Sequence, residues 1–207
     1  MNTEQIERIC DEYLGEKPQQ LNHMTFGHSN LVYEIKTARK EFILRANADA
    51  GALQGMVSNL NVLSELSLPV PKVDFLDLSK REYPFAWMLL TKIPGRDLKF
   101  ELPLMTKKQM TALANQIVSI QRKVGELPLG SGYGWVAIGE QGTYRSWADA
   151  MTSKLENNIK RVRHELTGIE RGAIKEKLAH HYAYCTHVQP RCFLDDITIK
   201  KCHHVSR

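Results

Sequence analysis

The sequence predicts an α+β fold in which a strand-rich first part, residues 1–94, precedes a mostly helical second part, residues 95–207. In the first part, apolar residues come mainly in short runs with the alternation typical of strands. In the second part, they recur every three or four residues, which is the period of helices. The turn Pro94-Gly95 marks the change between the two patterns.

The first part is expected to begin with a helix and to continue as a sheet with one further helix. Thr3 is a possible N-cap of the first helix, and Gly27 stands between the first two strands. Pro69 and Pro71 end the second helix. The expected elements are a helix over 3–14, strands over 21–27, 31–37 and 41–47, a helix over 53–66, an extended segment over 70–79 and a strand over 85–93.

Three helices are expected in the second part. The first covers 105–124, with Thr106 as its N-cap and Gly125 as its stop. A glycine-rich loop over 129–142 then leads to a helix over 146–166 that begins at the N-cap Ser146, and a last helix covers about 169–184. The loop glycines neither follow a strand nor open a helix, so a dinucleotide-binding motif is disfavoured.

Composition narrows the class of protein. The chain has 207 residues and a net charge of +5, which suits an anionic ligand such as a nucleotide but is too weak for a nucleic-acid-binding surface. The longest apolar runs, such as 85–90, are too short to span a bilayer. The N-terminus is polar and has no signal-peptide pattern, so we expect a cytoplasmic protein without membrane or nucleic-acid partners.

Three segments carry residues suited to nucleotide chemistry. Phe26-Gly27-His28-Ser29-Asn30 lies between two strands, where backbone N–H groups and short polar side chains can approach phosphates, although a plain hairpin turn fits equally well. Arg45 is the basic residue of the apolar strand EFILRA, and it either reaches phosphates or points into solvent. Thr91, Lys92 and Ile93 precede the turn Pro94-Gly95, where their backbone groups would meet a purine edge or form an ordinary linker.

Four stretches, in this order and spacing, resemble the aminoglycoside phosphotransferase family, which is related to choline kinases: FGHSNLVYEI, EFILRA, LSLPVPKV and FAWMLLTKIPGRDL. The resemblance is strongest from Leu21 to Leu98 and returns at Phe193. It implies a protein-kinase-like fold with a nucleotide-binding N-lobe and a helical C-lobe. It also implies transfer of the γ-phosphate of ATP, or in some members GTP, to a hydroxyl of an unidentified small-molecule acceptor, with Mg²⁺.

The resemblance also assigns roles to particular residues. Arg45 would bind the nucleotide phosphates, with Ser29 and Asn30 near them. The segment Thr91, Lys92 and Ile93 would meet the adenine, and Asp196 would be the catalytic base. Family members also carry an acid on the N-lobe helix that pairs with the cation of the third strand. Here Met56-Val57-Ser58-Asn59 occupies that region, and the nearest acid, Glu65, comes too late.

The C-terminal tail departs further from the family pattern. The catalytic loop usually begins His-Gly-Asp, where this chain has Leu194-Asp195-Asp196, and Lys201 stands where a metal-binding Asn is expected. No metal ligand is therefore assigned, and the C-lobe is expected to be truncated just after the loop begins. Deleting one A from AAA codons chosen for Lys200 and Lys201 restores Lys-Asn-Val-Ile-Met-Ser, so we hypothesise a frameshift that leaves the chain inactive or impaired.

Two other functions remain open on the sequence. One is a non-enzymatic kinase-like fragment or pseudogene product. The other is a metal-binding protein, since Cys185, His187, Cys192 and Cys202-His203-His204 supply soft donors. These residues form neither a Cys-x-x-Cys pair nor a His-x-x-x-His helix face, so the metal hypothesis is the weaker one.

Overall fold

The computed structural model describes residues 1–24, 30–95 and 98–182. Within these ranges the chain forms two compact units, Met1–Ile120 and residues 121–182, and the α+β prediction is confirmed. The division between the units falls inside one helix. The lobes expected over 1–94 and 95–207 remain a prediction.

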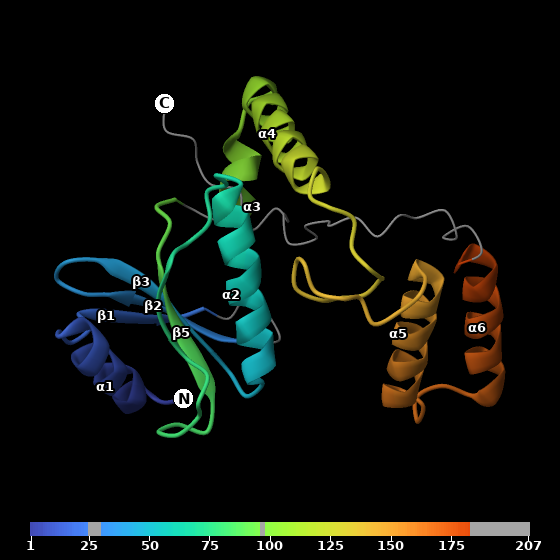
Figure 1. Cartoon of the computed structure of the whole chain (residues 1–207), viewed down its shortest axis with the longest axis horizontal. Helices are drawn as coiled ribbons and strands as arrows, with labels where there is room; N and C mark the ends of the chain where they lie inside the picture. Colours follow the sequence, from blue (N-terminus) through green and yellow to red (C-terminus); the bar gives the residue numbers. More distant parts are fainter. Residues whose placement is uncertain (25–29, 96–97, 183–207) are drawn as a thin grey trace. The chain divides into compact units, whose positions relative to one another are not determined.

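The first unit is built on a five-stranded antiparallel sheet with the order β1-β2-β3-β5-β4 (Figure 1). Register places Arg45 of β3 opposite Val32 of β2 and Met88 of β5. The central strand β3 is therefore paired on both sides, which holds its side chains in a fixed alternation between the two faces. The strands are β1 Gln20–His23, β2 Leu31–Lys36, β3 Glu41–Asn47, β4 Val73–Asp77 and β5 Ala86–Thr91.

Helix α1, Thr3–Leu14, covers one face of this sheet. Ile6, Ile9 and Cys10 are fully buried against strand residues such as Leu44 and Trp87. Burial, with smaller contributions from neighbouring acids, raises the pKa of the Cys10 thiol to about 11. The helix has the predicted bounds, but its N-cap is Asn2 rather than Thr3.

The cap of α1 is a reciprocal pair of hydrogen bonds. The Gln5 backbone N–H donates to Asn2 Oδ1 at 2.9 Å, and the Asn2 backbone N–H donates to Gln5 Oε1 at the same distance. This capping box satisfies two amides that would otherwise lack acceptors. The prediction of Thr3 was wrong because the Asn2 side chain already supplies the acceptor one residue earlier.

Helix α2, Ala50–Glu65, covers the opposite face of the sheet (Figure 1). It begins three residues before the predicted position because Asp49 caps it, with the Gly51 N–H donating to Asp49 Oδ1 at 2.9 Å. Leu53 is fully buried against Met88 and Leu90. The face under α2 is the one that carries Arg45, since Arg45 lies directly opposite Met88.

The remaining elements are helical. Thr106 and Ser146 are the predicted N-caps of α4 and α5, each with an N–H of the first turn donating to its hydroxyl. The two short elements α3 and η1 were not predicted, because three or four residues carry no measurable period. The elements are α3 Leu98–Glu101, η1 Leu102–Leu104, α4 Lys107–Gly125, α5 Trp147–Arg161 and α6 Gly168–Tyr182.

Helix α5 ends before the predicted residue 166, since a side chain from α6 closes the following loop. Arg171 Nη1 donates to the carbonyl oxygens of Arg163 and Leu166, at 2.9 and 2.5 Å. In the glycine-rich loop, Tyr133 and Tyr144 form an isolated bridge. A Cβ on Gly142 would collide there with the backbone of Gly132, so glycine allows the two backbone segments to approach each other.

Within the described ranges, no helix combines the length and apolar character needed to cross a membrane.

Candidate functional site

Arg45 lies near the middle of the sheet face that α2 covers. Strand alternation places Ile43, Arg45 and Asn47 on this face, whereas Leu44 and Ala46 point to the α1 side. The Arg45 side chain is half-buried. A half-buried guanidinium interacts more strongly with an anion than an exposed one, because less water screens it. The solvent-pointing alternative for Arg45 therefore does not describe this structure.

The contact between Arg45 and α2 is made through sulfur. Arg45 Nη1 donates to Met56 Sδ at 3.0 Å. A thioether is a weak acceptor and carries no charge, so this contact holds the guanidinium without neutralising it. Glu65 is the one acid in α2 and lies nine residues beyond Met56, about 13 Å along the helix axis. The lack of an acid near Met56 on α2 agrees with the expectation from the sequence.

Asn30, just before β2, is tied to the end of β3. Asn47 Nδ2 donates to Asn30 Oδ1 at 2.7 Å. Asn47 Oδ1 in turn accepts from the Asp49 N–H at 2.8 Å, and Asp49 caps α2. Three side chains thus link the start of β2, the end of β3 and the N-terminus of α2 on the face that carries Arg45.

The segment Thr91–Ile93 uses two of its amides inside the sheet. The Thr91 N–H donates to the Lys72 carbonyl at 2.9 Å, and the Lys92 N–H donates to the Glu41 carbonyl at 3.2 Å. Pro94 has no N–H. Within the described ranges, the Ile93 N–H is the amide of residues 91–94 that forms no hydrogen bond, so it is the donor that remains for a ligand edge.

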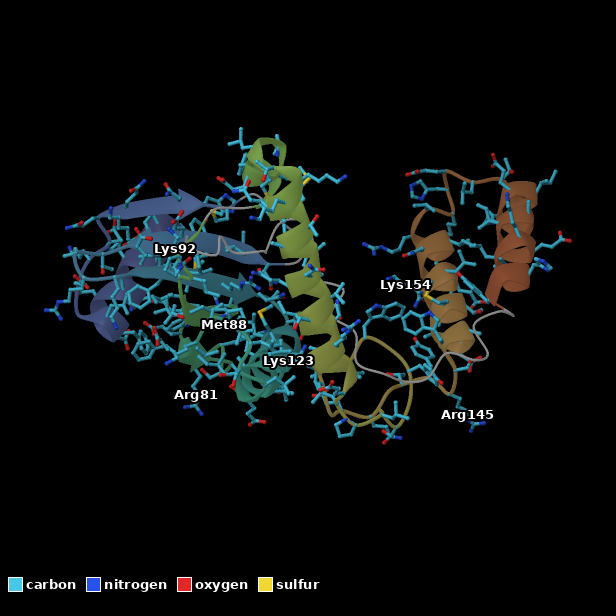
Figure 2. The ribbon with its side chains drawn as sticks, turned by 90° about the horizontal axis from the view of Figure 1, so that it is seen from above. Arg81, Met88, Lys92, Lys123, Arg145 and Lys154 are labelled. Atoms are coloured by element: carbon cyan, nitrogen blue, oxygen red, sulfur yellow. The ribbon has the colours of Figure 1, made fainter. Side chains whose placement is uncertain are left out.

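The Lys92 side chain, labelled in Figure 2, joins this segment to strands β2 and β3. Its Nζ contacts Glu34 Oε1 of β2 and lies 2.6 Å from Glu41 Oε2 of β3. Glu34 Oε2 also accepts from Asn22 Nδ2 of β1 at 3.4 Å. We name Lys92, Glu34 and Glu41 the lysine clamp. Because its ammonium is already paired with two carboxylates, Lys92 is poorly suited to bind phosphate, and Arg45 is the better candidate.

The pKa values of the lysine clamp follow from its contacts. Hydrogen bonding and charge attraction from Lys92 lower the pKa of the Glu41 carboxyl. Burial alone would lower the pKa of Lys92, but the hydrogen bonds that Lys92 donates to Glu34 and Glu41, together with the charge attraction of these carboxylates, outweigh it and raise that pKa overall. Both shifts favour the charged pair at neutral pH.

The clamp predicts a pH dependence of stability. A depressed carboxyl pKa stabilises the fold above the unfolded-state value, near pH 4.5, and this stabilisation is lost as pH falls through the lower folded-state value. Glu41→Gln should therefore lower the thermal midpoint at pH 7, and the difference from wild type should shrink below about pH 4.5. Thermal scans from pH 3 to 8 test this, with the exposed, unclamped Glu65→Gln as control. An equal deficit at pH 3 and pH 7 would contradict an ionic role.

Several predicted residues lie outside the described ranges. They include Ser29, the proposed catalytic base Asp196, and the tail donors Cys185, His187, Cys192, Cys202, His203 and His204. Among the residues that the structure does describe, no group of three or more His, Cys, Asp or Glu side chains could hold a metal ion. We assign no ligand for the Mg²⁺ that the resemblance implies and route no step through it.

The second unit carries its own basic feature. A groove of about 610 Å³ lies between α5 and α6 and is lined in part by Lys160, Arg163, Arg171 and Lys175. Lys175 Nζ lies 3.8 Å from Glu156 Oε1, and Arg171 is engaged with the loop carbonyls.

The family assignment comes from a family model. The model described as "Phosphotransferase enzyme family" matches residues 24–152, which is more than half of the chain and includes α2 and all of β2 to β5. The chain belongs to this phosphotransferase family. The matched residues include Arg45, the lysine clamp and the Asn30–Asn47 pair.

Solved structures confirm the protein-kinase-like fold. A thermostable mutant of the aminoglycoside phosphotransferase APH(4)-Ia has a TM-score of 0.64 at 15% identity, over 86% of this chain and 60% of that one. A putative fructosamine-3-kinase from Haemophilus somnus 129PT has a TM-score of 0.55 at 13% identity, over 87% and 61%. The GDP and kanamycin complex of APH(2")-IIia has a TM-score of 0.58 at 12% identity, over 90% and 60%.

The phosphotransferase-family chain therefore spans about 60% of the length of the solved structures it matches. At these identities the likeness shows the fold. No curated protein matches the sequence at a significant level.

The residues that hold the candidate site in place were not predicted from the sequence. The Lys92 side chain was expected to matter little, and neither Glu34, Glu41 nor Asn47 was named. Alternation would have placed Glu41 and Asn47 on the Arg45 face, since all three are odd-numbered residues of one strand. The pairing of Glu34 with Lys92 depends on strand register and had no local signal.

Proposed function

We propose that this chain is the nucleotide-binding part of a phosphotransferase that moves the γ-phosphate of ATP to a hydroxyl of a small molecule. The observation that carries the proposal is the position of Arg45. It lies half-buried on one sheet face, between the lysine clamp at one end of β3 and the Asn30–Asn47 pair at the other.

The order of side chains along β3 fits a nucleotide lying along the strand. Glu41 and the attached Lys92 segment come first, then the apolar Ile43, then Arg45, then Asn47. At about 3.3 Å per residue, Glu41 and Arg45 are roughly 13 Å apart. We assign the purine to the end near Ile93 and Ile43, and the phosphates to Arg45 and Asn30.

Asp196 is our proposed catalytic base, on the family resemblance alone. A carboxylate in that role accepts the proton of the acceptor hydroxyl as its oxygen attacks the γ-phosphorus. ATP or GTP is the proposed donor. Solved relatives include complexes with AMP-PNP and hygromycin B and with GDP and kanamycin, which supports a nucleotide and a small-molecule acceptor as partners.

Nucleotide-dependent thermal stability tests the proposal. A ligand present at 100 times its Kd stabilises the fold by about 2.7 kcal/mol, which for a chain of this size raises Tm by roughly 5–10 °C. We expect such a rise with ATP, with GTP compared in parallel and inorganic sulfate as the charge control. A Tm that stays unchanged with both nucleotides would contradict the proposed function.

A second candidate is nucleotide binding without phosphate transfer. The uncharged Met56 beside Arg45 favours it, since no acid of α2 pairs with this cation in the way the family pattern implies. Mass spectrometry of a panel of hydroxyl acceptors incubated with ATP separates the two candidates. Binding without any phosphorylated acceptor supports the second, and a mass gain of one phosphate supports the first.

A further inference from the structure

The hydrogen bond between Asn47 and Asn30 sets the orientation of the Asn30 side-chain amide. An amide side chain has an acceptor oxygen on one branch and an NH₂ donor on the other, and its orientation follows from its partners. The Asp49 backbone N–H lies 2.8 Å from one branch of Asn47. Because a backbone N–H can only donate, that branch must be the Asn47 oxygen.

The second amide follows from the first. With its oxygen held by Asp49, Asn47 has its NH₂ group on the other branch, 2.7 Å from Asn30. The atom of Asn30 that receives this donor must be its oxygen, Oδ1. The Asn30 NH₂ group is consequently on the branch away from Asn47, and it donates to no residue in the described ranges.

The orientation starts from helix α2. Asp49 Oδ1 accepts from the Gly51 N–H at 2.9 Å, so the cap that begins α2 also places the Asp49 N–H. The relay therefore runs from the α2 N-terminus through Asn47 to Asn30. The Asp49 backbone N–H fixes the polarity of the first step, and the orientation of the Asn47 amide that results fixes the polarity of the second.

We propose that Asn47 is a positioning residue that turns the NH₂ group of Asn30, rather than its carbonyl oxygen, toward the nucleotide phosphates. This inference rests on the proposed function, since it takes the phosphates to lie near Asn30. An NH₂ group donates to an anionic oxygen, whereas a carbonyl oxygen repels it. The polarity of the relay thus decides whether Asn30 attracts or repels the ligand.

Asn47→Asp is the sharpest variant, because it is nearly isosteric. The carboxylate that it introduces still accepts from the Asp49 N–H but has no hydrogen to give to Asn30. The Asn30 amide then turns to donate its NH₂ group to this carboxylate, which leaves its oxygen facing the ligand. Hydrogen bonds to charged groups contribute about 1.5–3 kcal/mol, so ATP affinity should fall roughly 10- to 100-fold.

Adenosine provides the matched ligand, since it lacks the phosphates. We expect its Kd to change less than about twofold in Asn47→Asp, and the Tm of the variant to stay close to wild type. Asn47→Ala frees the Asn30 amide without inverting it, so its loss of ATP affinity should be smaller than that of Asn47→Asp. Isothermal titration with ATP and adenosine measures both ligands on the same protein.

The charge that Asn47→Asp adds needs its own control. At 1 M salt the Debye length is about 3 Å, so simple repulsion of phosphate is screened, whereas amide orientation is not. We expect the ratio of variant to wild-type Kd for ATP to persist at about 1 M NaCl. A ratio that returns to one would overturn the inference, as would an equal loss of ATP and adenosine binding.

The two proposals fail in different ways. If wild type binds neither ATP nor adenosine, the proposed function is wrong and the role of Asn47 falls with it. If wild type binds both ligands and Asn47→Asp binds ATP as wild type does, the proposed function stands and the role of Asn47 alone is wrong.

Discussion

Replacing Arg45 by methionine is expected to weaken ATP binding by roughly 10- to 100-fold, because hydrogen bonds to charged groups contribute about 1.5–3 kcal/mol. Methionine keeps the length and apolar stem of the side chain, so it fits beside Val32 and Met88, the residues opposite position 45 on the neighbouring strands. Met56 loses its donor at small cost, since a thioether is a weak acceptor. Adenosine binding should be nearly unchanged, because Arg45 is assigned to the phosphates.

Arg39→Met is the matched control for Arg45→Met. Arg39 is an exposed arginine in the turn between β2 and β3, so its loss removes the same charge from the same hairpin. We expect ATP affinity to change less than twofold in this variant at physiological salt, where the Debye length is about 8 Å. Equal losses in the two variants, measured by isothermal titration, would show that Arg45 acts through net charge alone.

Trp87→Ala is expected to have the largest effect on stability. Trp87 of β5 is 1% exposed and packs edge-on against Tyr13 of α1, with ring centroids 4.8 Å apart. Truncating a buried aromatic side chain costs about 3–5 kcal/mol, a large part of the roughly 5–15 kcal/mol typical of a whole domain. Tm should fall by roughly 6–20 °C, because 1 kcal/mol corresponds to about 2–4 °C at this chain length.

Two companion variants make this prediction specific. Trp135 is 51% exposed, so Trp135→Ala removes an equal side chain with much less buried area and should lower Tm far less. Trp87→Phe keeps most of the packing and also removes an indole N–H that is buried without an acceptor in the described part of the chain. We expect the loss of stability in Trp87→Phe to be less than half of the loss in Trp87→Ala. A Tm for Trp87→Ala no lower than that for Trp135→Ala would contradict the core assignment.

The elements were the most predictable part of the fold. Helix α1 and strand β3 have the bounds expected from the sequence, because period and turn chemistry are local properties. The end of α5 was predicted too late, since Arg171 closes the loop after it through hydrogen bonds to two carbonyls that come earlier in the chain. A helix end that depends on a residue of a later helix cannot be predicted from the apolar period of the first helix.

The site divides in the same way. The amino-acid order alone determined that Arg45 is the cation of the third, apolar strand, that Asn30 directly precedes the second strand and that no acid lies near Met56 on the next helix. Only the tertiary structure decided what these residues do together. Strand register brings Glu34 and Glu41 to Lys92, and the start of α2 sets the polarity of Asn47 and Asn30. Pairing across strands depends on the whole sheet, because each strand's partner is chosen by burial and turn geometry far along the chain.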